Sequence, residues 1–127
     1  MNTAEEGLDI DRMLISDRAL DLVAMRFRSL GEPTRLKILR LLEGFEMSVG
    51  QLVERLQCSQ ANISKHLKIL VAAGILSRRV QGTSAYYAIS DPVITKVCDT
   101  ICRGMADNLK SQVEGFGFKM ARKRSTR

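Results

Sequence analysis

The stretch SQANISKHLKIL, Ser59 to Leu70, decides the fold because its apolar and polar residues separate onto two faces of one helix. Ile63, Leu67 and Leu70 recur at i, i+4 and i+7, the spacing of a stripe that packs on a core. Ser59 is a good N-cap residue. The first turn carries short or amide polar side chains, which can pair with base edges and bring no negative charge. An ordinary surface helix gives the same pattern, so the flanking segments must discriminate.

A shorter helix is predicted directly upstream, in SVGQLVERLQC. Ser48 and Gln51 form a capping-box pair at its start, and its apolar face consists of Leu52, Val53 and Leu56. Only Gln57 and Cys58 separate this helix from Ser59. Two helices joined by so short a turn cross steeply, which predicts a helix-turn-helix whose second helix can enter a major groove.

A β-hairpin is predicted directly downstream. Gly74 is the natural C-cap of the long helix, after which residues 75–80 and 85–89 have strand-like patterns. The residues between them, Gln81 to Ser84, are typical of a turn. A hairpin in this place is a wing. The predicted fold is therefore mainly α with a small β-hairpin, a winged helix-turn-helix of five helices and a two-stranded wing.

Local charge supports this interpretation better than net charge does. The net charge is +6, but the tail from Lys119 to Arg127 contributes five cations and no acid. From Arg55 to Ser90 there is no Asp or Glu, while five cations are present. An acid-free basic segment that coincides with the helix and the hairpin is the expected pattern of a phosphate-facing surface.

Side chains on this surface supply the candidate DNA contacts. We expect Gln60, Ser64, Lys65 and His66 to face bases or nearby phosphates, with Asn62 as a further candidate. On the wing, the expected contacts are made by Arg78, Arg79 and Thr83. The predicted partner is double-stranded operator DNA.

The other helices predict a homodimer. The first has a stripe of Leu20, Val23, Ala24 and Phe27, and the second begins at Pro33 and is expected to be deeply buried through Leu36, Ile38, Leu39, Leu41 and Leu42. The last helix aligns Ile94, Cys98, Ile101, Met105 and Leu109. A small winged domain already has its core, so a second subunit is expected to cover this stripe. Two reading helices would then address half-sites about one DNA turn apart.

The length predicts one domain with tails: an acidic arm over 1–16, a DNA-binding and dimerisation domain over 17–115 and a basic tail over 116–127. The arm lacks the basic start and apolar run of a signal peptide, and no segment reaches membrane-spanning length. We therefore expect a cytoplasmic protein without membrane contact. Its three cysteines are expected to be thiols rather than disulfides.

Three motifs together resemble the ArsR/SmtB family of winged-helix repressors from bacteria and archaea, over about Ala19 to Leu109. They are FRSLGEPTRLKILRLL at 27–42, SQANISKHLKILVAAGILSRR at 59–79 and GTSAYYAI at 82–89. The resemblance implies a homodimer that represses its operator and releases it when an inducer binds, in many members a metal ion or metalloid. The family's arsenic-type cysteine pair would fall near Met47 to Val53, where this chain has MSVGQLV. Its zinc-type site needs histidines on the last helix, but the only histidine is His66.

Cys98 and Cys102 remain as a candidate sensor, with Cys58 as a third ligand. Spaced i, i+4, the first two thiols share a helix face and can close on one thiophilic centre such as As(III) or Sb(III), which prefers about three thiolates. Two alternatives stay open. In the first, the cysteines are small apolar residues of the core and of the dimer stripe, and there is no metal inducer. In the second, they sense redox change or reactive sulfur species. No obligatory cofactor is expected.

Other function classes fit less well. The chain has no phosphate-binding glycine loop and no nucleophile with a histidine base, so we expect no enzyme. A winged domain that binds another protein need not keep an acid-free reading face. A repressor without a ligand of its own stays an alternative.

Overall fold

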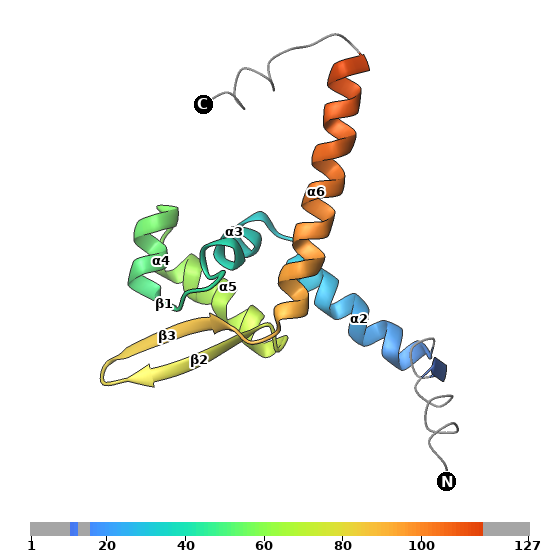
Figure 1. The fold of residues 1–127 in the computed structure, drawn as a ribbon. Coiled ribbons are helices and arrows are strands. Elements are labelled where there is room, and N and C mark those ends of the chain that lie inside the picture. Colours follow the sequence, from blue (N-terminus) through green and yellow to red (C-terminus); the bar gives the residue numbers. More distant parts are fainter. Residues whose placement is uncertain (1–10, 13–15, 116–127) are drawn as a thin grey trace. The chain divides into compact units, whose positions relative to one another are not determined.

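The computed structural model describes residues 11–12 and 16–115, which divide into two compact units at Asp91–Pro92. The first unit contains helices α2 (Asp17–Leu30), α3 (Pro33–Leu41), α4 (Val49–Leu56) and α5 (Gln60–Ala72), with strands β1 (Met47–Ser48), β2 (Leu76–Gln81) and β3 (Ser84–Ile89) (Figure 1). The described part of the second unit is α6 (Pro92–Gly115). The basic tail over 116–127 lies outside the described residues, as does the acidic arm except for residues 11, 12 and 16.

The helix ends follow the predicted signals. The capping box of Ser48 and Gln51 starts α4, and the Ser59 hydroxyl accepts from the backbone N–H of Asn62 to start α5. Gly74, with φ of 76°, follows the last residues of α5 and donates to Val71 O, while the N–H of Ile75 donates to Leu70 O. This Schellman arrangement needs a left-handed residue, which glycine adopts at low cost.

The core of the first unit is formed by the inner faces of α3, α4 and α5 and by the start of the hairpin. Seven of its side chains are less than 2% exposed: Ile38, Leu42, Leu52, Ile63, Leu67, Leu70 and Ile75. The predicted stripe of α5 is therefore confirmed. In α3 and its C-cap, Ile38, Leu39 and Leu42 are buried as expected, but Leu41 is only half-buried and the prediction was wrong for Leu36, which is 43% exposed.

The sheet has one strand more than the sequence predicted. Its order is β1-β3-β2, with β2 and β3 forming the wing hairpin and β1 pairing antiparallel with β3 through Met47↔Tyr87 and Ser48↔Tyr86. The hairpin closes through a two-residue turn whose first residue, Gly82, has φ of 62°, a position that a type II′ turn reserves for glycine. The additional strand, β1, attaches the middle of β3 to the helix-turn-helix, because β1 leads directly into α4.

Most of the exposed large apolar side chains of the described residues lie on two helices, α2 and α6. Every large apolar residue of the predicted α2 stripe is about half exposed, and so are its neighbours: Leu20, Leu22, Val23, Met25 and Phe27. On α6 the exposed members of the predicted stripe are Ile101, Met105 and Leu109. Among the described helices, none is long and apolar enough to cross a membrane.

Candidate nucleic-acid interface

The turn between α4 and α5 sets the direction of the candidate reading helix. Gln57 has a left-handed backbone, with φ of 54°, and its N–H donates to Val53 O. Cys58 follows, half-buried, with its Sγ 3.6 Å from Leu56 O. Ser59 then caps α5. The chain reverses within these three residues, which places α5 across α4 as a helix-turn-helix requires.

His66 faces inward, so the prediction that it contacts DNA is wrong for this structure. Its side chain is 4% exposed and lies on the buried face of α5 with Ile63, Leu67 and Leu70. The sequence contained the signal, because residues 63, 66, 67 and 70 complete the i, i+3, i+4, i+7 pattern of a buried helix face. His66 is the polar member of that face.

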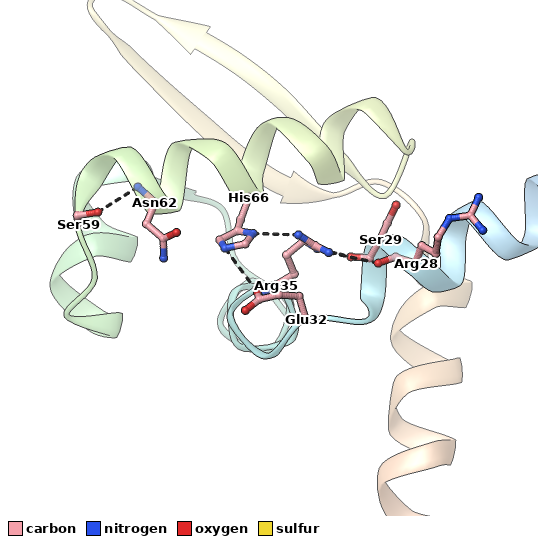
Figure 2. Close-up of polar contacts among 7 residues, drawn as sticks. All are labelled: Arg28, Ser29, Glu32, Arg35, Ser59, Asn62 and His66. Carbon is pink, nitrogen blue, oxygen red and sulfur yellow. Dashed lines mark hydrogen bonds and ion pairs between the residues drawn. The ribbon is translucent and has the colours of Figure 1, made fainter.

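Arg35 ties this histidine to two other helices (Figure 2). Its Nε donates to Ser29 O at 2.6 Å and its second terminal nitrogen to Arg28 O at 3.2 Å, which satisfies carbonyls at the end of α2. Its first terminal nitrogen lies 3.1 Å from His66 Nδ1. One guanidinium from α3 therefore holds the C-terminal end of α2 and the middle of α5.

The same geometry fixes the protonation state of His66. Arg35 can only donate, so Nδ1 must accept and the ring proton lies on Nε2, which faces the Glu32 carboxylate at 3.5 Å. Burial lowers the pKa of His66 from its usual 6.5, and the charges of Lys65 and Arg35 lower it further against the opposing effect of Glu32. His66 is therefore neutral in the fold at neutral pH.

The outer face of α5 carries the other predicted reading residues. Gln60, Ser64 and Lys65 are exposed, as the prediction required. Asn62 is half-buried and lies on the same side of the helix as His66 (Figure 2), one turn away from it. Lys68 is also exposed and extends the outer face. Lys68 belongs to the acid-free segment of the sequence but is not among the DNA contacts predicted from it.

A cleft of about 590 Å³ lies between α5 and the wing, and three cations line it. They are Lys65 and Lys68 from the helix and Arg78 from β2. The remaining lining residues are Ala61, Ser64, Val71, Ala72 and Tyr87. Among the residues that the structure describes, no acidic side chain lines the cleft, so its potential is positive and suits a phosphate backbone.

The three predicted DNA contacts of the wing differ in their partners within the protein. The Nε of Arg78 donates to the Tyr87 hydroxyl at 3.3 Å, a neutral partner that leaves the cationic charge uncompensated. Thr83 lies exposed in the turn at the wing tip. Arg79, in contrast, forms a salt bridge with Glu46, and its hydrogen bond to that carboxylate, followed by the carboxylate's charge, raises the pKa of Arg79. The acid-free segment in the sequence is therefore not acid-free in space.

The predicted three-cysteine site draws its residues from both units and stays a prediction. Cys58 lies in the helix-turn-helix, whereas Cys98 and Cys102 lie on α6, and none of the three is in a disulfide. In the part of the chain that the structure describes, no three Cys, His, Asp or Glu side chains form a group that could hold a metal ion. Cys98 is half-buried and Cys102 exposed.

Comparisons with known proteins give the same interpretation of the fold. The family model described as bacterial regulatory protein, arsR family, matches residues 32–78, the segment from the start of α3 to the wing. The repressor SdpR of Bacillus subtilis is 38% identical over 68 residues, which cover 54% of this chain and 76% of SdpR. The chain belongs to the ArsR family.

Two further relatives of this ArsR-family chain extend the comparison. A Streptomyces lividans protein named "Probable mercury resistance operon repressor" is 39% identical over 72 residues, 57% of this chain and 58% of that protein. The solution structure of the homodimeric winged helix-turn-helix DNA-binding domain of Mb0332 from Mycobacterium bovis superposes with a TM-score of 0.69 at 27% identity. It covers 76% of this chain and 92% of that domain, so the winged helix-turn-helix fold is confirmed.

The neutral His66 predicts that folding stability falls in mild acid. In the unfolded chain His66 has its usual pKa of about 6.5, whereas in the folded chain its pKa is lower. The contribution of His66 to stability is therefore fully present above about pH 6.5 and is lost as the pH falls toward the pKa of the folded state. Urea unfolding between about pH 7.5 and pH 5 should show this loss, with a slope of at most about 1.4 kcal/mol per pH unit. Glu32 and Glu46, whose pKa values are lowered from 4.5, act at lower pH.

The control is His66→Gln, which keeps an acceptor for Arg35 but does not titrate. We expect this variant to be less stable at neutral pH and to lose the slope between about pH 6.5 and pH 5. An unchanged slope in the variant would show that another group causes the acid sensitivity.

Proposed function

We propose that this protein is a DNA-binding transcriptional repressor. The observation that carries the proposal is the outer face of α5, where Gln60, Ser64 and Lys65 lie exposed beside a cationic cleft and a wing. Membership of the ArsR family and the named function of SdpR as a transcriptional repressor support it. A helix with a buried apolar face and an acid-free outer face can enter a major groove without an electrostatic penalty.

The proposed contacts divide into those that specify sequence and those that only hold DNA. Gln60 can pair with an adenine edge through its amide, and Ser64 and Lys65 can reach base acceptors or phosphates. Lys68 and Arg78 line the cleft and suit the backbone. Thr83 at the wing tip is placed to contact an adjacent phosphate or groove edge, and Asn62, half-buried, contributes at most at the rim.

The functional form is proposed to be a homodimer. Five large apolar side chains of α2 and three of the α6 stripe are about half exposed or more, and a monomer would leave them in water: Leu20, Leu22, Val23, Met25, Phe27, Ile101, Met105 and Leu109. The Mb0332 domain, of the same fold, is homodimeric. Two-fold symmetry would present two copies of α5 to half-sites roughly 34 to 36 Å apart.

The inducer is proposed to be a thiophilic ion such as As(III) or Sb(III), acting on the thiol pair of α6. Cys98 and Cys102 lie one turn apart on a helix with an exposed apolar stripe, so drawing them together can alter how α6 packs on a partner. The relative named for mercury resistance supports a soft metal or metalloid. Coupling of roughly 1 to 3 kcal/mol is the usual size of such an effect.

Substitutions on the outer face of α5 should separate base recognition from phosphate binding. Lys68→Gln should weaken binding to all duplexes alike and reduce the salt slope by about one, because one phosphate contact is lost. Gln60→Ala should instead change the order of preference among selected sequences, by about 1 to 3 kcal/mol at one base position. Fluorescence anisotropy with a selected and a mixed-sequence duplex measures both effects.

Lys37→Gln is the matched control, since Lys37 is an exposed lysine of α3 outside the reading helix and the wing. It should leave both the slope and the preference unchanged. If Lys68→Gln altered preference while Gln60→Ala altered only the slope, the assignment of the two roles would be wrong.

The thiol pair gives a separate test. With operator DNA bound, arsenite should reduce the affinity of the unmodified protein by roughly 5- to 150-fold, while Cys98→Ser combined with Cys102→Ser should abolish that response. Cys58→Ser tests the predicted third ligand: a reduced response would show that Cys58 joins the pair, and a full response would show that the pair acts without it. The same variants treated with polysulfide test the redox alternative. Full arsenite response in the double variant would refute the proposed sensor.

A further inference from the structure

The outermost arginine of the wing is already bound by a carboxylate. Arg79 donates from Nε to Glu46 Oε2 at 3.2 Å and from one terminal nitrogen to Glu46 Oε1 at 2.5 Å. Its other terminal nitrogen donates to Gln81 Oε1 at 2.7 Å. A carboxylate held by two parallel N–H groups occupies the geometry in which arginine binds phosphate.

The three-stranded sheet creates this contact across 33 positions of sequence. Arg79 on β2 pairs in register with Tyr86 on β3, and Tyr86 pairs with Ser48 on β1. Glu46 immediately precedes β1, so the arginine side chain crosses the central strand to reach it. Its guanidinium carbon lies 4.9 Å from the centre of the Tyr86 ring, which supports the side chain along the way.

We propose that Glu46 limits DNA affinity by occupying Arg79 in place of a DNA phosphate. The proposal rests on the proposed DNA-binding function and deepens it, because it names the residue that sets how many cations the wing offers. While the pair is closed, Arg78 offers its charge to phosphate, because its partner among the described residues, the Tyr87 hydroxyl, is neutral. Arg79 becomes a phosphate contact only when Glu46 releases it.

The exposure of the pair makes this exchange practicable. The side chains of Arg79 and Glu46 are 50% and 42% exposed, so both are reachable from solvent and the pair is weakened by salt screening. The hydrogen bond from Arg79 lowers the pKa of Glu46, so the carboxylate stays charged at neutral pH. A phosphate that binds Arg79 must therefore displace a charged carboxylate. The free energy of binding gained by this exchange is only the difference between two similar ion pairs.

Removal of that competitor should add a phosphate contact. Binding of the full chain to a fluorescein-labelled mixed-sequence duplex is measured by anisotropy across a range of salt concentrations. Glu46→Gln should bind more tightly than the unmodified protein at low salt and have a steeper salt dependence, by about 0.9 for each wing that gains a phosphate. That slope corresponds to roughly threefold more affinity lost over a fourfold rise in salt concentration.

Two further substitutions separate this mechanism from a general charge effect. Glu43→Gln removes the same charge from the same connection, where Glu43 pairs with Arg40 rather than with Arg79, and should leave the slope unchanged. Arg79→Met should have little effect alone, but in the Glu46→Gln background it should cancel the gain. Thermal unfolding of each variant checks that the fold is retained.

Three results would overturn this inference and leave the proposed function intact. Equal gains from Glu46→Gln and Glu43→Gln would show a nonspecific charge effect. If Arg79→Met alone reduced the salt slope by a full phosphate contact, Arg79 would reach phosphate despite Glu46. Weaker binding by Glu46→Gln would show that Glu46 only supports the wing. Absence of DNA binding by the unmodified protein would refute the proposed function itself, and this inference with it.

Discussion

The packing of the inner face of α5 against the rest of the first unit is the constraint on which the arrangement depends. Ile63, Leu67 and Leu70 are fully buried, and burial of each such side chain stabilises the fold by about 1.5 to 3 kcal/mol. His66 on the same face is held by Arg35, which also binds carbonyls of α2. Because these contacts fix the rotation of α5, its outer residues have a fixed direction as well. A reading face is thus a consequence of the buried face.

Much of this could be predicted from local sequence, because helix caps and helical periodicity act over a few residues. The capping box at Ser48, the cap at Ser59 and the left-handed Gly74 all occur where their chemistry requires them. His66 does not follow its residue type: a histidine can serve as a DNA contact, but its position at i+3 from Ile63 places it on the buried side of α5. The paired Nδ1 and Nε2 explain how a polar ring tolerates that burial.

Long-range features were not predictable in the same way. The two residues of β1 are too few to reveal a strand from periodicity, and the contact between Glu46 and Arg79 exists only because β1 joins the wing sheet. Charge counted along the sequence therefore overestimated the cationic character of the wing. The thiols of α6 illustrate a related limit, since spacing can place Cys98 and Cys102 on one face but cannot supply a third ligand.

The central claim, that the outer face of α5 binds DNA, is tested most directly by mapping backbone amide chemical shifts of the isotope-labelled chain as duplex DNA is added. We expect the largest changes at Gln60, Ser64 and Lys65 and along the wing, with little change at Lys37 on α3. Changes confined to α3 or to the exposed apolar residues of α2, with none on the outer face of α5, would contradict it.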